Sequence, residues 1–425
     1  MQASKYIEEA EKKVWNVPGL SGSLPKREIK TIGVIGAGTM GGGIAMNFAN
    51  VGIPVHIVET DQERLDHGLK VIDANYNRSI KRGSLTEDVL KERMSMITSS
   101  TTLTDLMSCD LIIEAAYEDM ELKKQIFKEL DKIAKPFAIL ATNTSALDIN
   151  KIALQTLRPD DIIGLHFFSP ANVMKLLEVV RAKFTSDVVV ASCLSVAERI
   201  NKIPTLVGVC PGFVGNRILF ERQKQALDLV YQGIMPWDID KAWNEFGFKM
   251  GPFQMSDLAG LDIGWEKGSV TTNEIRDALC ELDRRGQKTE AGYYDYDENR
   301  VPRTSKITES IIKNITGNKD PIEKESNEII ELCVFPMINE ALKILEEGKA
   351  QRPSDIDVVW LNGYGYPRDK GGLLFWADQV GPKKILSSLL KMNAKGCNVE
   401  ISELLLDVCK NSRNILDFAD QQIRV

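Results

Sequence analysis

The chain has 425 residues, 43% hydrophobic and 27% charged, which corresponds to two to four globular domains at about 150 residues each. An excess of 60 Asp and Glu over 53 Lys and Arg argues against a protein dedicated to nucleic-acid binding, because such a protein needs a basic face. The charged N-terminus is unlike a secretory signal, and no run of 18 apolar residues predicts a membrane span. Seven scattered cysteines, none in a C-x-x-C pair, predict reduced thiols in a soluble intracellular protein and no metal site.

The first half of the chain has the pattern of an α/β domain. Residues 5–15 predict a short helix, and a tether rich in Pro and Gly follows it. From Lys30 onward, short apolar runs alternate with amphipathic helices, as a parallel sheet requires. Residues 62–94 are too long for an ordinary crossover and predict a helical hairpin. The predicted strands are residues 31–35, 55–59, 111–115, 138–142, 162–166, 176–180 and 205–209.

The second half is periodic at helical spacing and contains an internal repeat. Pro236-Trp-Asp-Ile-Asp-Lys-Ala-Trp243 recurs 117 residues later as Pro353-Ser-Asp-Ile-Asp-Val-Val-Trp360. An Asp-x-x-Gly follows each copy, at Asp257 and at Asp378. We therefore expect two duplicated all-α domains and the following division of the chain: an N-terminal helix and linker (1–28), a dinucleotide-binding domain (29–210), a first helical domain (211–322), and a degenerate second helical domain with a tail (323–425).

A glycine-rich turn after the first strand predicts a dinucleotide site. Gly36-Ala-Gly38-Thr-Met-Gly41 lies between an apolar strand and a helix, where backbone N–H groups and the helix dipole favour phosphates. Glu59 ends the next strand, 18 residues after the last glycine, where a carboxylate accepts hydrogen bonds from ribose hydroxyls and repels a 2′-phosphate. The pattern favours NAD over NADP. The predicted cofactor residues here are Gly36, Gly38, Thr39, Met40, Gly41 and Glu59.

One of the three histidines ends a predicted strand on the ligand-facing edge of the sheet. His56 lies within a strand and His67 on a charged helix, whereas His166 is the last residue of its strand. Pro170 lets the chain turn back, so a returning strand could place Glu178 against His166. A carboxylate there would orient the imidazole and stabilise its protonated form.

Several motifs in the same order resemble the L-3-hydroxyacyl-CoA dehydrogenase family. Within that family, the later motifs are similar to the dehydrogenase part of the peroxisomal multifunctional enzymes type 1 of fatty-acid β-oxidation. The resemblance covers roughly residues 28–390 and rests on these segments: Glu114-Ala-Ala-Tyr-Glu118, Asn143-Thr-Ser145, His166-Phe-Phe-Ser-Pro170 through Glu178, Pro211-Gly-Phe-Val-Gly-Asn-Arg217, Phe246-Gly-Phe-Lys-Met-Gly-Pro-Phe253, Arg285-Gly-Gln-Lys-Thr289, Gly363-Tyr-Gly-Tyr-Pro367 and Lys370-Gly-Gly372.

The resemblance implies a fold and a chemistry. It implies a Rossmann-type domain followed by helical domains like the C-terminal domain of 6-phosphogluconate dehydrogenase. His166 is then the general base that takes the 3-hydroxyl proton of an acyl-CoA substrate while a hydride passes to NAD, and Glu178 pairs with it. Ser145 and Asn216 are expected to hydrogen-bond the substrate oxygen and the imidazole. Further cofactor contacts are expected from Ala115, Glu118, Lys123 and Asn143.

The resemblance also sets expectations about assembly and location. About 30 residues precede the first strand, too few for a hydratase domain, so a separate enoyl-CoA hydratase is a possible partner. The second helical domain lacks a counterpart of Pro211-Gly-Phe…Asn216, and we expect it to replace a partner subunit's domain, giving a monomer with an internal pseudo-dimer. Peroxisomal residence follows from the resemblance alone, because the chain ends Gln-Ile-Arg-Val, and a cytoplasmic location is the alternative.

Three questions stay open at this stage. Lys70, Arg78, Lys81 and Arg82 on the predicted hairpin could bind CoA phosphates or could form a solvated helix face. A dehydrogenase acting on a 3-hydroxy acid without CoA would share much of the plan. The third question is whether the chain is a non-catalytic NAD-binding scaffold. Such a scaffold is expected to have lost the acid–base pair, but His166 and Glu178 are both present.

Overall fold

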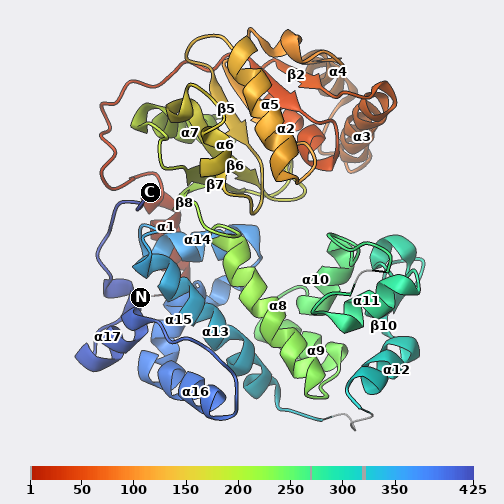
Figure 1. Cartoon of the computed structure of the whole chain (residues 1–425), viewed down its shortest axis with the longest axis vertical. Helices are drawn as coiled ribbons and strands as arrows, with labels where there is room; N and C mark the ends of the chain where they lie inside the picture. The colour runs from red at the N-terminus through yellow and green to blue at the C-terminus, as the bar shows by residue number, and fades with distance from the viewer. Residues whose placement is uncertain (1, 269, 318–321) are drawn as a thin grey trace.

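The computed structural model describes residues 2–268, 270–317 and 322–425. One eight-stranded sheet with helices on its faces forms the upper body in Figure 1, and helices form the lower body. The strands of the sheet are β1 (Ile32–Ile35), β2 (Val55–Val58), β3 (Ile97–Ser100), β4 (Leu111–Glu114), β5 (Ile139–Thr142), β6 (Ile162–Phe167), β7 (Leu176–Arg181) and β8 (Ile203–Gly208). The helices of this domain are α2 (Thr39–Ala49), α3 (Gln62–Lys81), α4 (Glu87–Ser95), α5 (Met120–Ile133), α6 (Ile149–Ala153) and α7 (Asp187–Arg199).

The order of the strands creates a binding crevice at the carboxyl ends of the parallel strands. They follow the order β3-β2-β1-β4-β5-β6-β7-β8, and the pairs from β3 to β6 are parallel. Strand β7 pairs antiparallel with β6 and parallel with β8. The order reverses between β1 and β4, and the crevice outside the carboxyl ends of such strands is where doubly wound sheets bind ligands. The central strands are buried on both faces, as their unbroken apolar runs predict.

All seven predicted strands are present, and the hairpin of residues 62–94 is formed by α3 and α4. Strand β3 was not predicted, because its sequence Ile-Thr-Ser-Ser is short and polar and lies half-exposed at the sheet edge. The expectation of two all-α domains is wrong in one detail, because the first of them contains two short strands. Strands β9 (Tyr294–Tyr296) and β10 (Pro302–Thr304) form a small antiparallel ribbon, and three residues each are too few for a periodic signal.

Two groups of helices follow the sheet domain. Helix α8 of the first group packs along α13 of the second, and both lie near the middle of the lower body in Figure 1. The first group is α8 (Gly215–Tyr231), α9 (Pro236–Phe246), α10 (Pro252–Ala259), α11 (Glu274–Glu281) and α12 (Lys306–Ile315). The second is α13 (Ser326–Glu346), α14 (Pro353–Gly363), α15 (Leu373–Val380), α16 (Pro382–Ala394) and α17 (Glu403–Asn411). We propose that the two groups are separate domains with a boundary near residue 322. Residues 318–321, next to this boundary, lie outside the described residues.

The repeated Asp-Ile-Asp segments make equivalent contacts in the two groups. The carboxylate of Asp240 on α9 accepts the N–H groups of Phe253 and Gln254 at the start of α10, at 3.0 and 2.8 Å. The carboxylate of Asp357 on α14 accepts the N–H groups at the start of α15 in the same way, from Leu374 at 2.7 Å and Phe375 at 3.1 Å. Asp257 and Asp378 likewise each accept two consecutive backbone N–H groups. The sequence repeat is therefore also a structural repeat.

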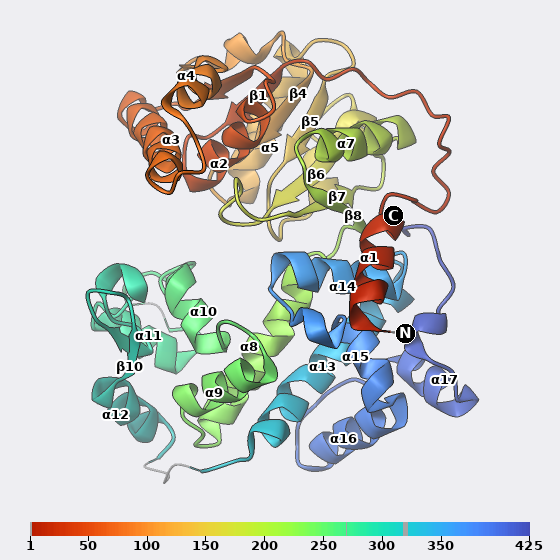
Figure 2. The same cartoon turned by 180° about the vertical axis from the view of Figure 1, so that it is seen from behind.

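A tyrosine hydroxyl also donates to Asp240 and to Asp357, whose surroundings we call the two Asp sites, but the two tyrosines come from different parts of the chain. The hydroxyl of Tyr294 on β9 donates to Asp240 at 2.8 Å. At Asp357 the donor is Tyr6 of α1 (Ala3–Lys13), at 2.6 Å. Figure 2 shows α1 in red beside the blue helices α14 and α15. The N-terminal helix thus does for the second helical group what the β9 ribbon does for the first.

Replacing Tyr6 with Phe is expected to destabilise the second helical group, more at pH 8 than at pH 5. Burial raises the pKa of Asp357 from its ordinary value of 3.8 to about 7, so the folded state favours the protonated carboxyl. This contribution to stability is complete below about pH 4, and it is lost as the pH rises through 7. Above that pH the Tyr6 hydroxyl serves a buried carboxylate, and its loss costs about 1.5–3 kcal/mol, against about 1 kcal/mol at pH 5. Urea denaturation at the two pH values measures the difference. Lys5→Gln, on the exposed face of α1, is the control, and an equal cost at both pH values would contradict the argument.

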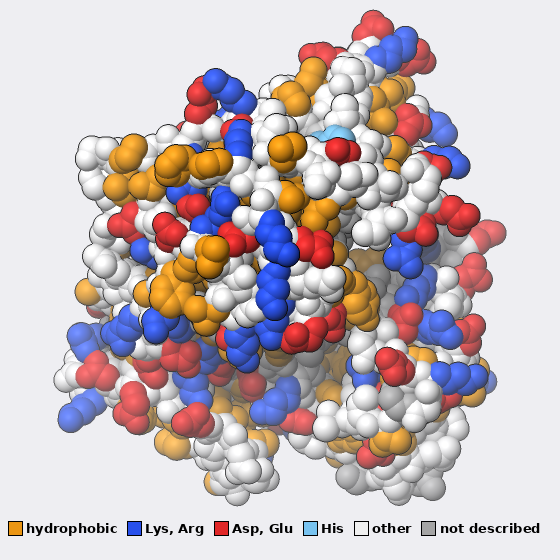
Figure 3. All heavy atoms as spheres, turned by 45° about the horizontal axis from the view of Figure 1, so that its top comes forward, with side chains coloured by type: hydrophobic (Ala, Val, Ile, Leu, Met, Phe, Trp, Pro, Cys, Tyr) orange, Lys and Arg blue, Asp and Glu red, His pale blue; other side chains and the backbone are white. Residues whose placement is uncertain are grey.

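The surface carries mixed charges. On the face shown in Figure 3, Lys and Arg side chains are interspersed with Asp and Glu and do not gather into one basic patch. Within the described residues, no helix is long and apolar enough to cross a membrane.

Candidate active site

The glycine turn leaves room for a dinucleotide backbone at the start of α2. Gly36 has φ +100°, and a Cβ there would lie 2.6 Å from the carbonyl oxygen of Ala115 at the end of β4. A Cβ on Gly41 would overlap the carbonyl of Gly36. Gly38 faces open space and begins α2 with no side-chain cap, so the N–H groups of the first turn, at Thr39 and Met40, remain for an anion. These residues fit a pyrophosphate.

Glu59 lies where the ribose end of the same cofactor would extend. It directly follows β2, which neighbours β1 in the sheet. Its carboxylate accepts the N–H of Ala37 at 3.2 Å and the N–H of Thr60 at 3.0 Å, so it is held against the glycine turn. A carboxylate in this place suits the two ribose hydroxyls of NAD and opposes the phosphate of NADP.

His166 and Glu178 are directly opposed in the antiparallel pair of β6 and β7, as the sequence predicts. The imidazole Nδ1 lies 2.7 Å from Glu178 Oε2, and both side chains are buried. The rings of Phe168 and Phe213 pack on the imidazole, with centroids 4.5 and 5.7 Å away. Because a carboxylate accepts, Nδ1 carries the proton and donates it to Glu178, which leaves Nε2 as the acceptor.

The second oxygen of Glu178 caps the first helix of the helical region. The N–H of Gly215, the first residue of α8, donates to Glu178 Oε1 at 2.9 Å. Val214, the residue before the helix, supplies no side-chain cap, so Glu178 takes that place from the neighbouring domain. The positive end of the α8 dipole and this N–H stabilise the charged carboxylate. The sheet domain and α8 are therefore joined at the His166–Glu178 pair.

Ser145, Asn216 and Glu118 surround the same end of the sheet. The Asn216 side-chain N–H donates to the backbone carbonyl of Ser145 at 3.4 Å. Glu118 accepts hydrogen bonds from the Ser145 N–H at 2.9 Å and from the Thr144 hydroxyl at 2.5 Å. Burial tends to raise the pKa of Glu118, but these hydrogen bonds and the Lys123 charge outweigh it and hold that pKa below its usual value. Glu118 is therefore a fixed negative charge near the predicted nicotinamide position.

Lys123 lies beneath Glu118 and not on the surface of the crevice. Its side chain is 1% exposed, and its ammonium is 2.7 Å from Glu114 Oε1 and 3.4 Å from Glu118 Oε2. Glu114, fully buried at the end of β4, also accepts from the Thr142 hydroxyl and the Ala116 N–H, each at 2.7 Å. Because Lys123 is buried, it would influence a bound cofactor through its ion pair with Glu118 and not by direct contact.

The remaining predicted cofactor residues lie at the carboxyl ends of neighbouring strands. Ala115 follows β4, and its N–H donates to the carbonyl of Ile35 at 2.8 Å. Asn143 follows β5, and its side-chain oxygen accepts the N–H of Phe167 at 2.9 Å. Asn143 thereby ties the end of β5 to the strand that carries His166.

A pocket of about 320 Å³ opens between the glycine turn, α3 and the loop after β6. Gly38 and Thr39 line one side, and Arg78 of α3 and Arg82, which directly follows that helix, line the other. Lys70 and Lys81 are not part of its lining. Of the four cations on the hairpin, two therefore face a ligand-sized space beside the predicted cofactor site.

Two residues of this site had no predicted role. Thr144 belongs to the Asn143-Thr-Ser145 motif but was given no function, and the structure shows its hydroxyl on Glu118. Tyr364 belongs to the Gly363-Tyr-Gly-Tyr-Pro367 motif, and its hydroxyl donates to Asn216 Oδ1 at 2.8 Å. The second helical domain, which lacks a counterpart of the Asn216 motif, therefore still contributes a side chain, Tyr364, that contacts a candidate catalytic residue.

The fold and this site define an NAD-dependent dehydrogenase with a Rossmann-type sheet domain and a helical C-terminal region. The chain belongs to the 3-hydroxyacyl-CoA dehydrogenase family. The NAD-binding domain of that family matches residues 31–210. Its C-terminal domain matches residues 212–296 and 329–414, the two segments that contain the repeats.

The most similar proteins include peroxisomal enzymes. The peroxisomal bifunctional enzyme of Homo sapiens is 42% identical over 422 residues, which is 92% of this chain and 58% of that protein. A peroxisomal fatty acid β-oxidation multifunctional protein of Arabidopsis thaliana is 37% identical over 403 residues, covering 91% of this chain and 56% of its own length. The chain thus spans little more than half the length of the curated relatives that it matches.

Solved structures agree with the observed fold. The 3-hydroxybutyryl-CoA dehydrogenase of Escherichia coli has a TM-score of 0.76 and 26% identity, over 91% of this chain and 99% of that one. The dehydrogenase part of multifunctional enzyme 1 from C. elegans has a TM-score of 0.63 and 30% identity, over 88% of each chain.

Proposed function

We propose that this chain oxidises L-3-hydroxyacyl-CoA to 3-ketoacyl-CoA with NAD, as the dehydrogenase step of fatty-acid β-oxidation. The observation that carries the proposal is the buried His166–Glu178 pair at the carboxyl end of β6, on the sheet edge that also holds the glycine turn. The family match and the β-oxidation relatives support the substrate class. Bound NAD would supply the chemistry of accepting a hydride from the 3-carbon.

His166 acts as the general base in this proposal. With Nδ1 donating to Glu178, Nε2 is free to take the proton of the substrate 3-hydroxyl. Glu178 compensates the positive charge that the imidazole gains, and the Gly215 N–H holds the carboxylate in place. Phe168 and Phe213 exclude water from the ring, which strengthens both interactions.

The other candidate residues position the reactants. Asn216 has one side-chain N–H on the Ser145 carbonyl and a second that is available to the substrate oxygen. The Ser145 hydroxyl donates to Glu118 Oε1 at 3.3 Å, so it lies beside the predicted nicotinamide position. Glu118 contacts the nicotinamide half of the cofactor, and Lys123 holds Glu118 from below. The glycine turn and Glu59 bind the pyrophosphate and the ribose.

The pocket beside α3 is proposed to bind the CoA end of the substrate. Arg78 and Arg82 present two positive charges to it, as phosphate groups require. Its opposite wall includes Pro170 and Val173, in the loop directly after the strand of His166, so a ligand anchored on α3 would be led toward the imidazole. A substrate without CoA would leave these arginines without a ligand.

Oxidation of NADH by acetoacetyl-CoA, and by 3-ketoacyl-CoAs of increasing length, tests the proposal. The purified chain is expected to turn over these substrates with NADH and at least tenfold less efficiently with NADPH, because Glu59 opposes the extra phosphate. Free acetoacetate is the control for the CoA requirement. Absence of turnover with every CoA substrate would support an NAD-binding scaffold, and equal turnover of acetoacetate would support a dehydrogenase for 3-hydroxy acids without CoA.

We further propose that the chain is a monomer in which the second helical domain takes the place of a partner subunit. The packing of α8 along α13 and the paired Asp sites support this arrangement. Light scattering at micromolar concentration is expected to give the mass of one chain, and an obligate dimer would refute it. Peroxisomal residence is proposed from the relatives, which are peroxisomal enzymes, and localisation of the tagged protein tests it. A separate enoyl-CoA hydratase partner is proposed from the place of the reaction in β-oxidation, and co-purification of hydratase activity tests it.

A further inference from the structure

Tyr364 brings the second helical domain into the candidate active site. It directly follows α14, and its hydroxyl donates to Asn216 Oδ1 at 2.8 Å. These two residues are 148 positions apart and belong to different copies of the repeat. A hypothetical Cβ on Gly215, the neighbour of Asn216, would lie 2.6 Å from the tyrosine oxygen, so the helix start and the hydroxyl are packed closely together.

The hydrogen bonds around Asn216 determine which way its amide points. The carbonyl of Ser145 can only accept, so it takes an N–H and fixes the Nδ2 side of the amide. The Tyr364 hydroxyl donates to the opposite side and fixes Oδ1. Burial raises the pKa of Tyr364 well above its usual value, so the hydroxyl keeps its proton and remains a donor. With both sides fixed, the second N–H of Nδ2 is the group left for a ligand.

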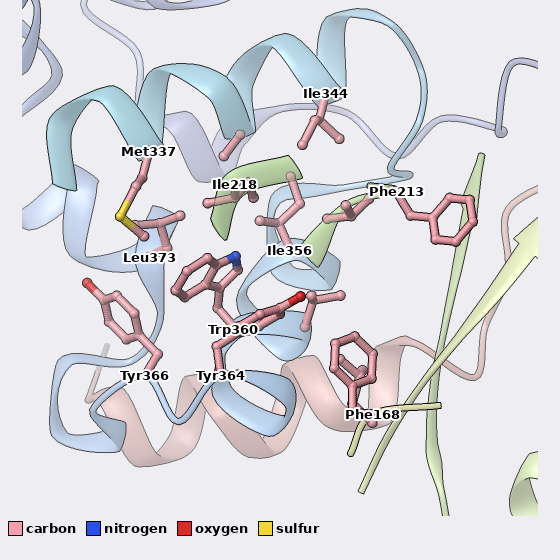
Figure 4. Close-up of a cluster of buried hydrophobic side chains, with 14 of the residues drawn as sticks. Phe168, Phe213, Ile218, Met337, Ile344, Ile356, Trp360, Tyr364, Tyr366 and Leu373 are labelled. Atoms are coloured by element: carbon pink, nitrogen blue, oxygen red, sulfur yellow. The ribbon is translucent and has the colours of Figure 1, made fainter. Parts of the chain in front are cut away.

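The ring of Tyr364 is held by aromatic contacts that do not depend on its hydroxyl. It stacks on Trp360 with centroids 4.6 Å apart, and its edge meets Phe168 at 5.5 Å. Phe168 in turn packs on His166. Figure 4 shows Tyr364 and Tyr366 on opposite sides of Trp360, so the two phenols of this motif face different parts of the core. Removing the hydroxyl alone therefore leaves the packing of the ring unchanged.

We propose that Tyr364 is a positioning residue for the dehydrogenase reaction, in which its hydroxyl holds the Asn216 amide with an N–H directed at the reacting oxygen. The inference rests on the proposed function and on the role of Asn216 within it. It gives the degenerate repeat a part in catalysis: the second copy completes the site of the first through a side chain that touches neither the substrate nor the cofactor.

The test compares Tyr364→Phe with Tyr366→Phe. Tyr366 is a matched control, because its hydroxyl is buried two residues away and has no hydrogen-bond partner among the described residues. Tyr364→Phe is expected to lower kcat about three- to tenfold, the worth of one hydrogen bond, with KM for NADH and for acetoacetyl-CoA changed less than twofold. Tyr366→Phe is expected to leave kcat within about 1.5-fold. Tyr364→Phe should melt somewhat lower than the wild type because it loses a buried hydrogen bond, so kcat is compared well below both melting temperatures.

A double-mutant cycle with Asn216→Ala assigns the effect to the Asn216 amide. If Tyr364 acts through Asn216, Tyr364→Phe has no further effect on kcat in the Asn216→Ala background. A full additional loss in that background, or wild-type kcat in Tyr364→Phe alone, would overturn the inference while leaving the proposed function in place. A wild-type chain without turnover refutes the proposed function itself and this inference with it.

Discussion

Replacing His166 with Gln is expected to lower kcat by about 10²- to 10⁴-fold, because the substrate hydroxyl loses its general base. Gln fills part of the space between Phe168 and Phe213 and can still hydrogen-bond Glu178, so the fold and NAD binding should persist. Steady-state reduction of NAD with L-3-hydroxybutyryl-CoA, the direction in which His166 accepts the proton, measures kcat, and the melting temperature with and without NAD reports folding and cofactor binding. Near-wild-type turnover in this variant would refute the mechanism.

Glu178→Gln is the companion variant, because it keeps the shape of the pair but reverses one hydrogen bond. The Gln oxygen can still accept from Gly215, which turns its NH₂ group toward His166 Nδ1. The imidazole must then accept at Nδ1 and carry its proton on Nε2, where it can no longer act as a base. A loss of kcat comparable to that of His166→Gln is therefore expected, as when the carboxylate that orients a catalytic histidine is replaced by its amide. A small effect would mean that Glu178 caps α8 without setting the tautomer.

These residues were predictable because their signals are local. The apolar run before His166, the turn at Pro170 and the 12-residue spacing to Glu178 predict an antiparallel pair, and β6 and β7 form it with the two residues opposed. The glycine turn followed by Glu59 is likewise a pattern within about 25 residues of sequence. Local hydrogen bonding and strand pairing determine both features.

Other features depend on contacts that no local pattern contains. Tyr364 reaches Asn216 across a domain boundary, and Tyr6 reaches Asp357 over 351 positions. Lys123 lies on an amphipathic helix, where a lysine is usually solvated. In the structure it is buried instead, with its ammonium next to Glu114 and Glu118. Tyr364 belongs to a motif and Tyr6 does not, but in both cases the partner follows only from the packing of whole domains.

Lys123→Met is expected to destabilise the sheet domain by about 3 kcal/mol, because it leaves the carboxylate of Glu114 buried without its cation. For a domain of this size that corresponds to a melting temperature lower by roughly 6–12 °C, measurable by calorimetry. Lys124→Met is the matched control on the same helix. Its ion pair with Glu121 is solvent-exposed, so its loss should cost at most about 1 kcal/mol.

A second substitution separates the charge of Glu114 from the packing of Lys123. Glu114→Gln in the Lys123→Met background removes the unpaired charge. The amide oxygen can still accept the Ala116 N–H while the NH₂ group donates to the Thr142 hydroxyl, so at least half of the lost stability should return. Lys123→Met is also expected to raise KM for NADH, because Glu118 loses the positive charge that holds it from below, and KM should stay raised in this double variant. Recovery of both stability and KM would mean that Lys123 only neutralises Glu114, whereas recovery of stability alone assigns it a role in the cofactor site through Glu118.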